Sequence, residues 1–62
     1  MLDWQKRVVV EKEELDKKIA KLESFDLTTV SVGESVLLRE QLVVMQDYSS
    51  ILKNRIAGFK VS

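Results

Sequence analysis

The strongest constraint on the fold of this chain is the spacing of apolar residues between positions 31 and 59. Apolar side chains recur there every three or four residues, which is the period of an α-helix that buries one face. The series consists of Leu38, Leu42, Met45, Tyr48, Leu52, Ile56 and Phe59. A second apolar series runs beside it at seven-residue spacing, with Leu37, Val44 and Ile51. One helix needs a single stripe to pack on one neighbour, so the second series predicts contact with another subunit.

The N-terminal part of the chain carries a matching stripe. Its apolar members are Trp4, Val8, Leu15, Ile19, Leu22 and Phe25, and they predict a helix over residues 3–25 with Asp3 as its N-cap. Glu11 interrupts this stripe. Val9 and Val10 lie away from Leu15 on the helix surface, so we expect them to contact another subunit. The remaining face, which includes Asp16, is charged and is expected to be solvated.

The periodicity stops at residues 26–30 and resumes after a helix-start signal. Ser31 and Glu34 have the spacing of a capping box, in which the serine hydroxyl accepts from the Glu34 backbone N–H. Gly58 is the residue type favoured just past a helix C-terminus. We therefore predict an all-α fold, an antiparallel hairpin of helices 3–25 and 31–57, with residues 1–62 as one helical-hairpin domain. Folding back in this way places Glu11 near Tyr48 and Trp4 near Ile56.

Length and composition indicate how such a hairpin is stabilised. A chain of 62 residues is marginal alone and usually relies on disulfides, a metal or oligomerisation. It has no cysteine and no histidine, which removes disulfides and the usual zinc ligands. The sequence therefore predicts a homo-oligomeric helical bundle, without a metal or a cofactor.

The charge balance and hydropathy exclude several partners. Ten basic and ten acidic residues cancel, which argues against binding to a DNA or RNA polymer. The N-terminus lacks the apolar core of a signal peptide, and the longest apolar run, residues 42–45, is far shorter than a membrane span. We expect a soluble, cytoplasmic protein with no membrane partner.

One end of the predicted hairpin gathers residues that core packing alone would not select. These candidate ligand-binding residues are Arg7, Arg55, Tyr48, Trp4 and Glu11. Arginine can bind phosphate through two parallel hydrogen bonds and an aromatic ring can stack on a base, so the group suits a planar anionic ligand. A structural ion pair, or an arginine reaching solvent at a helix end, explains the same residues without a ligand. No catalytic signature is present: Ser49 and Ser50 lack an activating histidine, and the carboxylates lack paired spacing.

The whole pattern resembles a family of very small phage-encoded proteins. It reads W-Q-x-R-V-V-x-E-x-x-E-L-x-x-K-I-x-K-L-x-x-F from Trp4 to Phe25, then L-L-x-x-Q-x-x-x-M-x-x-Y-x-x-x-L-x-x-R-I-x-x-F from Leu37 to Phe59. Glu11, Tyr48 and Arg55 are its most informative positions. The family looks related to the helical hairpin of phage anti-CBASS and anti-Thoeris sponge proteins, which oligomerise and bind cyclic nucleotide or cyclic ADP-ribose signals without cleaving them.

The resemblance implies a non-enzymatic sponge that protects a phage in the cytoplasm of the infected bacterial host. It also implies a homo-oligomer, with a hexamer as one option, and ligand pockets between its subunits. The alternative from the residues alone is a non-catalytic, oligomeric helical module that docks on a host or phage protein.

Overall fold

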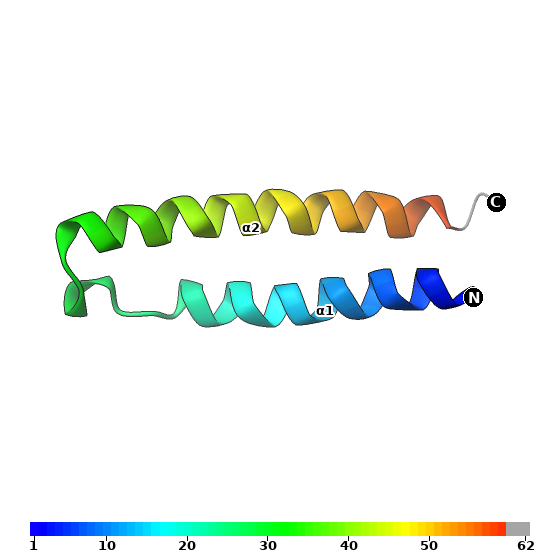
Figure 1. Cartoon of the computed structure of the whole chain (residues 1–62), viewed down its shortest axis with the longest axis horizontal. Coiled ribbons are helices and arrows are strands. Elements are labelled where there is room, and N and C mark those ends of the chain that lie inside the picture. Colours follow the sequence, from blue (N-terminus) through cyan, green and yellow to red (C-terminus); the bar gives the residue numbers. More distant parts are fainter. Residues whose placement is uncertain (60–62) are drawn as a thin grey trace.

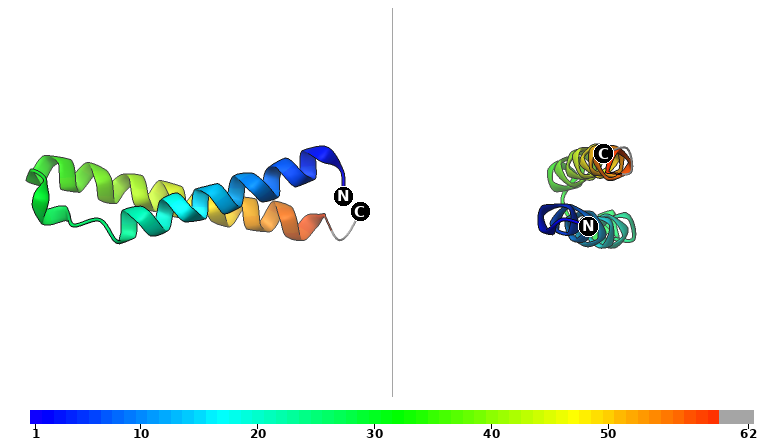
Figure 2. Two further views of the ribbon diagram at one scale, coloured as in Figure 1. Left: turned by 90° about the horizontal axis from the view of Figure 1, so that it is seen from below. Right: turned by 90° about the vertical axis from the view of Figure 1, so that its right-hand side faces the viewer.

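The computed structural model describes residues 1–59, which form two long antiparallel helices joined by a short connection (Figure 1). Helix α1 spans Asp3–Glu23 and helix α2 spans Val32–Gly58, with a single 3₁₀ turn, η1, at Leu27–Thr29 between them. The hairpin is a rod of 47 × 14 × 14 Å, and Figure 2 shows the two helices crossing at a shallow angle with both termini at one end. The predicted all-α hairpin is confirmed; residues 60–62 of the predicted domain lie outside the described residues.

Both ends of α1 differ from the prediction. Leu2, not Asp3, is the N-cap, because the Gln5 side chain accepts a hydrogen bond from the Leu2 backbone N–H at 2.9 Å and closes the first turn one residue earlier. Asp3 instead lies in the first turn, where its negative charge suits the helix dipole. The helix ends at Glu23, so Phe25 lies beyond it. The Ser24 hydroxyl donates to the Lys21 carbonyl at 2.9 Å and helps satisfy this end.

The early end of α1 follows from the side chain of Asp26. Its Oδ1 accepts from the Thr28 backbone N–H at 2.9 Å and from the Thr28 hydroxyl at 2.6 Å. Such local bonds offer the backbone an alternative to a further helical turn. Both bonds lower the pKa of Asp26 below its ordinary value, and the bond from the Thr28 hydroxyl has the larger effect. The connection is thus an ordered turn and not a loose loop.

Helix α2 begins as predicted and ends one residue later. The Ser31 hydroxyl accepts from the Glu34 backbone N–H at 3.2 Å, as a capping serine does. Gly58 is the last residue of α2 and does not follow its end, and Phe59 is the C-cap. No residue of the described chain has a positive φ, so this C-terminus does not use the left-handed backbone that favours glycine.

The hydrophobic core is a thin seam between the helices. Among residues 1–59, three side chains are buried: Val8, Ile19 and Leu52, with Leu52 fully inaccessible. The other predicted stripe positions of both helices are mostly half-buried along the same seam, including Leu15, Leu22, Leu38, Leu42, Met45 and Ile56. Two helices alone cannot enclose more than the residues that point directly at each other.

Much apolar surface therefore remains outside the seam. Leu37, Val44 and Ile51, here called the outer stripe, are 60%, 66% and 55% exposed. Val10 is also exposed, whereas Val9 is half-buried within the hairpin. Their contact with another subunit stays a prediction. Neither α1 nor α2 has the length and apolar character needed to cross a membrane.

Candidate functional site

The centre of the candidate site is a hydrogen bond between the two helices. The hydroxyl of Tyr48 on α2 donates to Oε1 of Glu11 on α1, so the predicted proximity of these residues is confirmed. Glu11 is exposed and not part of the buried stripe, because the helix rotates it toward solvent at the edge of the seam. The bond to Glu11 raises the pKa of Tyr48 above its ordinary value, and burial and the Glu11 charge act in the same direction. The nearby Arg55 charge opposes this increase.

A shallow groove of about 390 Å³ lies at the end of the hairpin that holds the termini. We call it the open-end groove; its lining residues are Trp4, Gln5, Arg55, Gly58 and Phe59. The Trp4 and Phe59 rings meet edge to face, with centroids 5.1 Å apart and an interplanar angle of 84°. Trp4 thus packs on Phe59, one turn beyond the predicted Ile56, and stays 50% exposed. Edge-to-face packing leaves part of the indole available to a ligand.

The structure divides the five predicted ligand-binding residues into three places. Trp4 and Arg55 share the open-end groove, and Arg55 is exposed there rather than buried. Glu11 and Tyr48 form the bridge next to it and do not line it. Arg7 is exposed on α1 and lines none of the grooves described here. A single hairpin therefore does not bring all five side chains into one groove.

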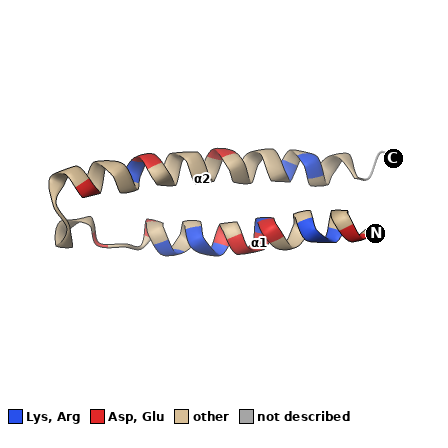
Figure 3. Cartoon of the chain, in the orientation of Figure 1, with Lys and Arg blue, Asp and Glu red and all other residues tan. Residues whose placement is uncertain are grey.

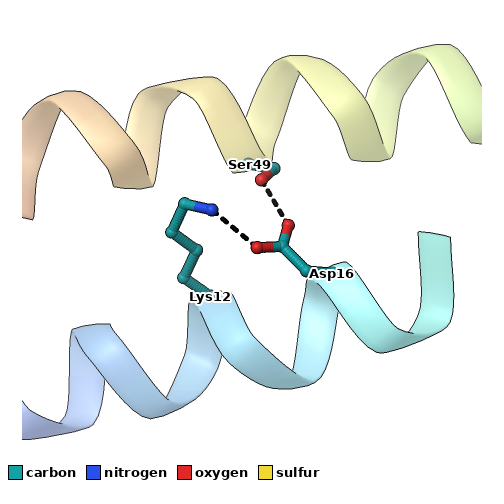
Figure 4. Close-up of polar contacts among 3 residues, drawn as sticks. All are labelled: Lys12, Asp16 and Ser49. Carbon is teal, nitrogen blue, oxygen red and sulfur yellow. Dashed lines mark hydrogen bonds and ion pairs between the residues drawn. The ribbon is translucent and has the colours of Figure 1, made fainter. Parts of the chain in front are cut away.

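Sequence reasoning missed a polar clamp between the helices. Asp16 Oδ2 lies 2.6 Å from Lys12 Nζ, and its Oδ1 accepts from the Ser49 hydroxyl at 2.6 Å (Figure 4). Asp16 is half-buried against α2 and is not on the solvated face where it was predicted. The bonds from Lys12 and then Ser49 lower its pKa below the ordinary value of aspartate. The four-residue spacing of Lys12 and Asp16 was the available signal, but nothing in the sequence indicated Ser49 as a partner.

A second groove lies nearer the connection, where no ligand contact was predicted. This closed-end groove has a volume of about 440 Å³; its lining residues are Lys18, Lys21, Leu22, Phe25, Gln41 and Met45. A neighbouring depression is lined by Glu14, Lys17, Lys18 and Lys21. Figure 3 shows that charged residues are much denser along α1 than along α2. The closed-end groove therefore combines apolar side chains with two lysines, whereas the depression beside it is lined by charged residues.

The acidic side chains are spread along the helices. Within residues 1–59, no three carboxylates gather in a group that could hold a metal ion. What the grooves offer instead is aromatic surface, positive charge and amide groups, which suit binding of an organic anion through stacking and hydrogen bonds.

The sequence of this hairpin matches a known protein family. The model of the Sequestin family matches residues 2–58, which include both helices, the Tyr48–Glu11 bridge, the closed-end groove and every residue that lines the open-end groove except Phe59. The chain belongs to the Sequestin family. No curated protein and no solved structure matches the chain. The name Sequestin suggests a sequestering role, and a Sequestin hairpin with open, cation-lined grooves has surface on which a ligand could be held.

Proposed function

We propose that this protein is a sponge that binds and sequesters cyclic oligonucleotide or cyclic ADP-ribose type immune signals without cleaving them. The observation that carries the proposal is the placement of Trp4 beside Arg55 in the open-end groove of a Sequestin-family hairpin. A half-exposed indole provides a stacking surface for a base, and a guanidinium provides paired donors for a phosphate. A base and a phosphate are present in every such signal.

Glu11, Tyr48 and Arg7 have supporting roles in this proposal. Tyr48 and Glu11 lie next to the open-end groove, and the Glu11 carboxylate can accept from an amino group of a base that extends beyond the groove. Arg7 lies three residues after Trp4 on α1, so a ligand that extends along the helix from Trp4 would reach it.

The proposal includes self-association through the outer stripe and Val10. In the described part of the chain the hairpin buries only three residues, whereas Leu37, Val44 and Ile51 each remain more than half exposed. Covering this surface with further copies would supply the core that one hairpin lacks. In a homo-oligomer, with a hexamer as one option, a second subunit would also close the shallow open-end groove around the ligand. In this proposal the protein acts in the cytoplasm of an infected bacterium and protects the phage from the CBASS or Thoeris defence system.

Calorimetry with a panel of cyclic di- and trinucleotides and cyclic ADP-ribose isomers tests the proposal. We expect saturable heat for at least one ligand, intact ligand after release, and at least about a tenfold loss of affinity in Arg55→Ala, or about 1.4 kcal/mol. Arg39→Ala is the matched control, because Arg39 is an exposed arginine of the same helix outside both grooves. No heat for any ligand at high micromolar concentration contradicts the proposal.

A second candidate function rests on the outer stripe alone. An exposed apolar row at helical spacing can lie in the groove of another protein, so the hairpin could be an interaction module for a host or phage protein. Two results together would favour this function over the sponge. The wild type would recover a stoichiometric partner from host lysate that Val44→Glu does not recover, and the ligand panel would give no heat.

A further inference from the structure

The closed-end groove lies on the same side of the hairpin as the Tyr48–Glu11 bridge. Lys18 follows Glu11 by seven residues on α1, and Gln41 precedes Tyr48 by seven residues on α2, so each pair shares a helix face. The groove therefore continues the surface of the bridge toward the connection, whereas Trp4 and Arg55 lie toward the termini. This separation makes the closed-end groove a different place on the molecule from the open-end groove.

Positive charge at the closed-end groove is not neutralised within the described chain. Lys18 and Lys21 line it, Lys17 lies beside it, and none of the three makes an ion pair among residues 1–59. Lys12 differs, because Asp16 holds it at 2.6 Å. Glu14 is the one carboxylate that lines the adjacent depression, so the three lysines leave an excess of positive charge. An anion placed here would meet ammonium groups without having to displace a carboxylate.

The rest of the groove suits the planar part of such an anion. Phe25 lies just past the end of α1 and is 45% exposed, which leaves ring surface free for stacking. Leu22 and Met45 provide an apolar floor, and the Gln41 amide provides both a donor and an acceptor beside them. The volume of about 440 Å³ falls within the range of small-molecule sites, roughly 300–1,000 Å³.

We propose that the closed-end groove is a second ligand site that binds a nucleoside monophosphate or the equivalent part of a larger nucleotide. In this arrangement the base stacks on Phe25 and contacts Gln41, and the phosphate lies between Lys18 and Lys21. The site does not depend on ligand binding at the open-end groove, because no residue lines both.

The two grooves can be observed separately in one sample. The chain has two methionines: Met45 lines the closed-end groove, and Met1 is 74% exposed near the opposite end of α1. Carbon-13 labelling of the methionine methyl groups therefore reports the closed-end groove with Met1 as an internal reference. The single tryptophan, Trp4, reports the open-end groove by fluorescence. We would titrate the full chain with adenosine 5′-monophosphate, and separately with adenosine and with inorganic phosphate.

We expect the Met45 methyl signal to shift saturably with adenosine monophosphate, more weakly with either fragment, and less at high salt, because salt screens the lysines. Lys21→Gln should weaken this binding about twofold to fivefold, the loss expected for one partly exposed charge contact. Lys6→Gln is the matched control, since Lys6 is an exposed lysine of α1 outside the groove. Phe25→Leu should reduce the response to adenosine but not that to phosphate.

Three results would overturn the second site. The Met45 signal could stay unchanged up to millimolar nucleotide, or it could respond equally in wild type and Lys21→Gln. It could also shift with protein concentration alone, which would assign the groove to contact with a second copy. A Trp4 response without a Met45 response would support ligand binding at the open-end groove and reject binding at the closed-end groove. A Met45 response without a Trp4 response would support the closed-end groove and not the open-end groove.

Discussion

The Tyr48 hydroxyl donates a hydrogen bond to the Glu11 carboxylate across the two helices, joining residues 37 positions apart in the sequence. Trp4 precedes Glu11 on α1 and Arg55 follows Tyr48 on α2, whereas Lys18 and Gln41 lie on the side of the bridge nearer the connection. The bridge thus stands between the two grooves proposed to bind ligands. Neither Tyr48 nor Glu11 lines either groove.

The first prediction concerns the titration of Tyr48. Because Glu11 favours the protonated hydroxyl, we expect Tyr48 in the folded protein to ionise above the usual pKa of about 10. Tyr48 is the only tyrosine, so its ultraviolet absorbance can be followed directly. Glu11→Gln should lower the midpoint toward the value of the unfolded chain, whereas Glu14→Gln should leave it unchanged.

The same shift has a consequence for stability. A folded pKa above the unfolded pKa means that this contribution is complete below the unfolded pKa and is lost as pH rises through the folded pKa. Wild type should therefore lose stability in that alkaline range more steeply than Tyr48→Phe. Equal tyrosine midpoints in the folded and urea-unfolded chains would contradict both statements.

The second prediction concerns the clamp between Asp16 and Ser49. Ser49→Ala removes the hydroxyl that Asp16 accepts from, so the urea midpoint of unfolding should fall. Ser50→Ala is a close control, because Ser50 is exposed and makes no side-chain hydrogen bond among residues 1–59. If the two alanine variants unfold at the same urea concentration, the clamp does not contribute to stability.

The third prediction concerns Leu52, the only side chain within residues 1–59 that has no exposed surface. Leu52→Ala should lower the free energy of unfolding by about 2–5 kcal/mol, because it removes buried methyl groups and leaves a cavity. Small domains have roughly 0.05–0.15 kcal/mol of stability per residue, so this loss is comparable to the total. Leu2→Ala, at a 60% exposed position, should change helix content little by circular dichroism. A cooperative transition retained in Leu52→Ala at wild-type stability would refute the assignment of the core.

The fourth prediction tests self-association through the outer stripe. Sedimentation of the wild type should give a multiple of the 7.1 kDa chain mass. Ile51→Glu places a charge at the C-terminal end of the outer stripe and should release single chains with reduced helix content. Ser50→Glu adds the same charge at the neighbouring position on another face and should keep the wild-type mass. A wild type that sediments as a stably folded single chain would exclude the oligomer.

The sequence by itself determined the two helices, their order and the start of α2. Helical period and the Ser31 cap are local properties, since they depend on residues three or four positions apart. The same period also predicted which residues form the seam and that Leu37, Val44 and Ile51 would lie outside it. Glu11 and Tyr48 followed from the antiparallel register alone.

Only the tertiary structure decided how the polar residues are distributed around that seam. The sequence predicts both Arg7 and Arg55 as ligand-binding residues, but of the two only Arg55 lines the open-end groove. Asp16 turned out to be half-buried because Ser49 lies opposite it. Phe25 lines the closed-end groove because the Asp26 turn ends α1 before it. Each outcome depends on the relative rotation of two helices or on competition at a helix end, and neither is specified by the spacing of residues along one helix.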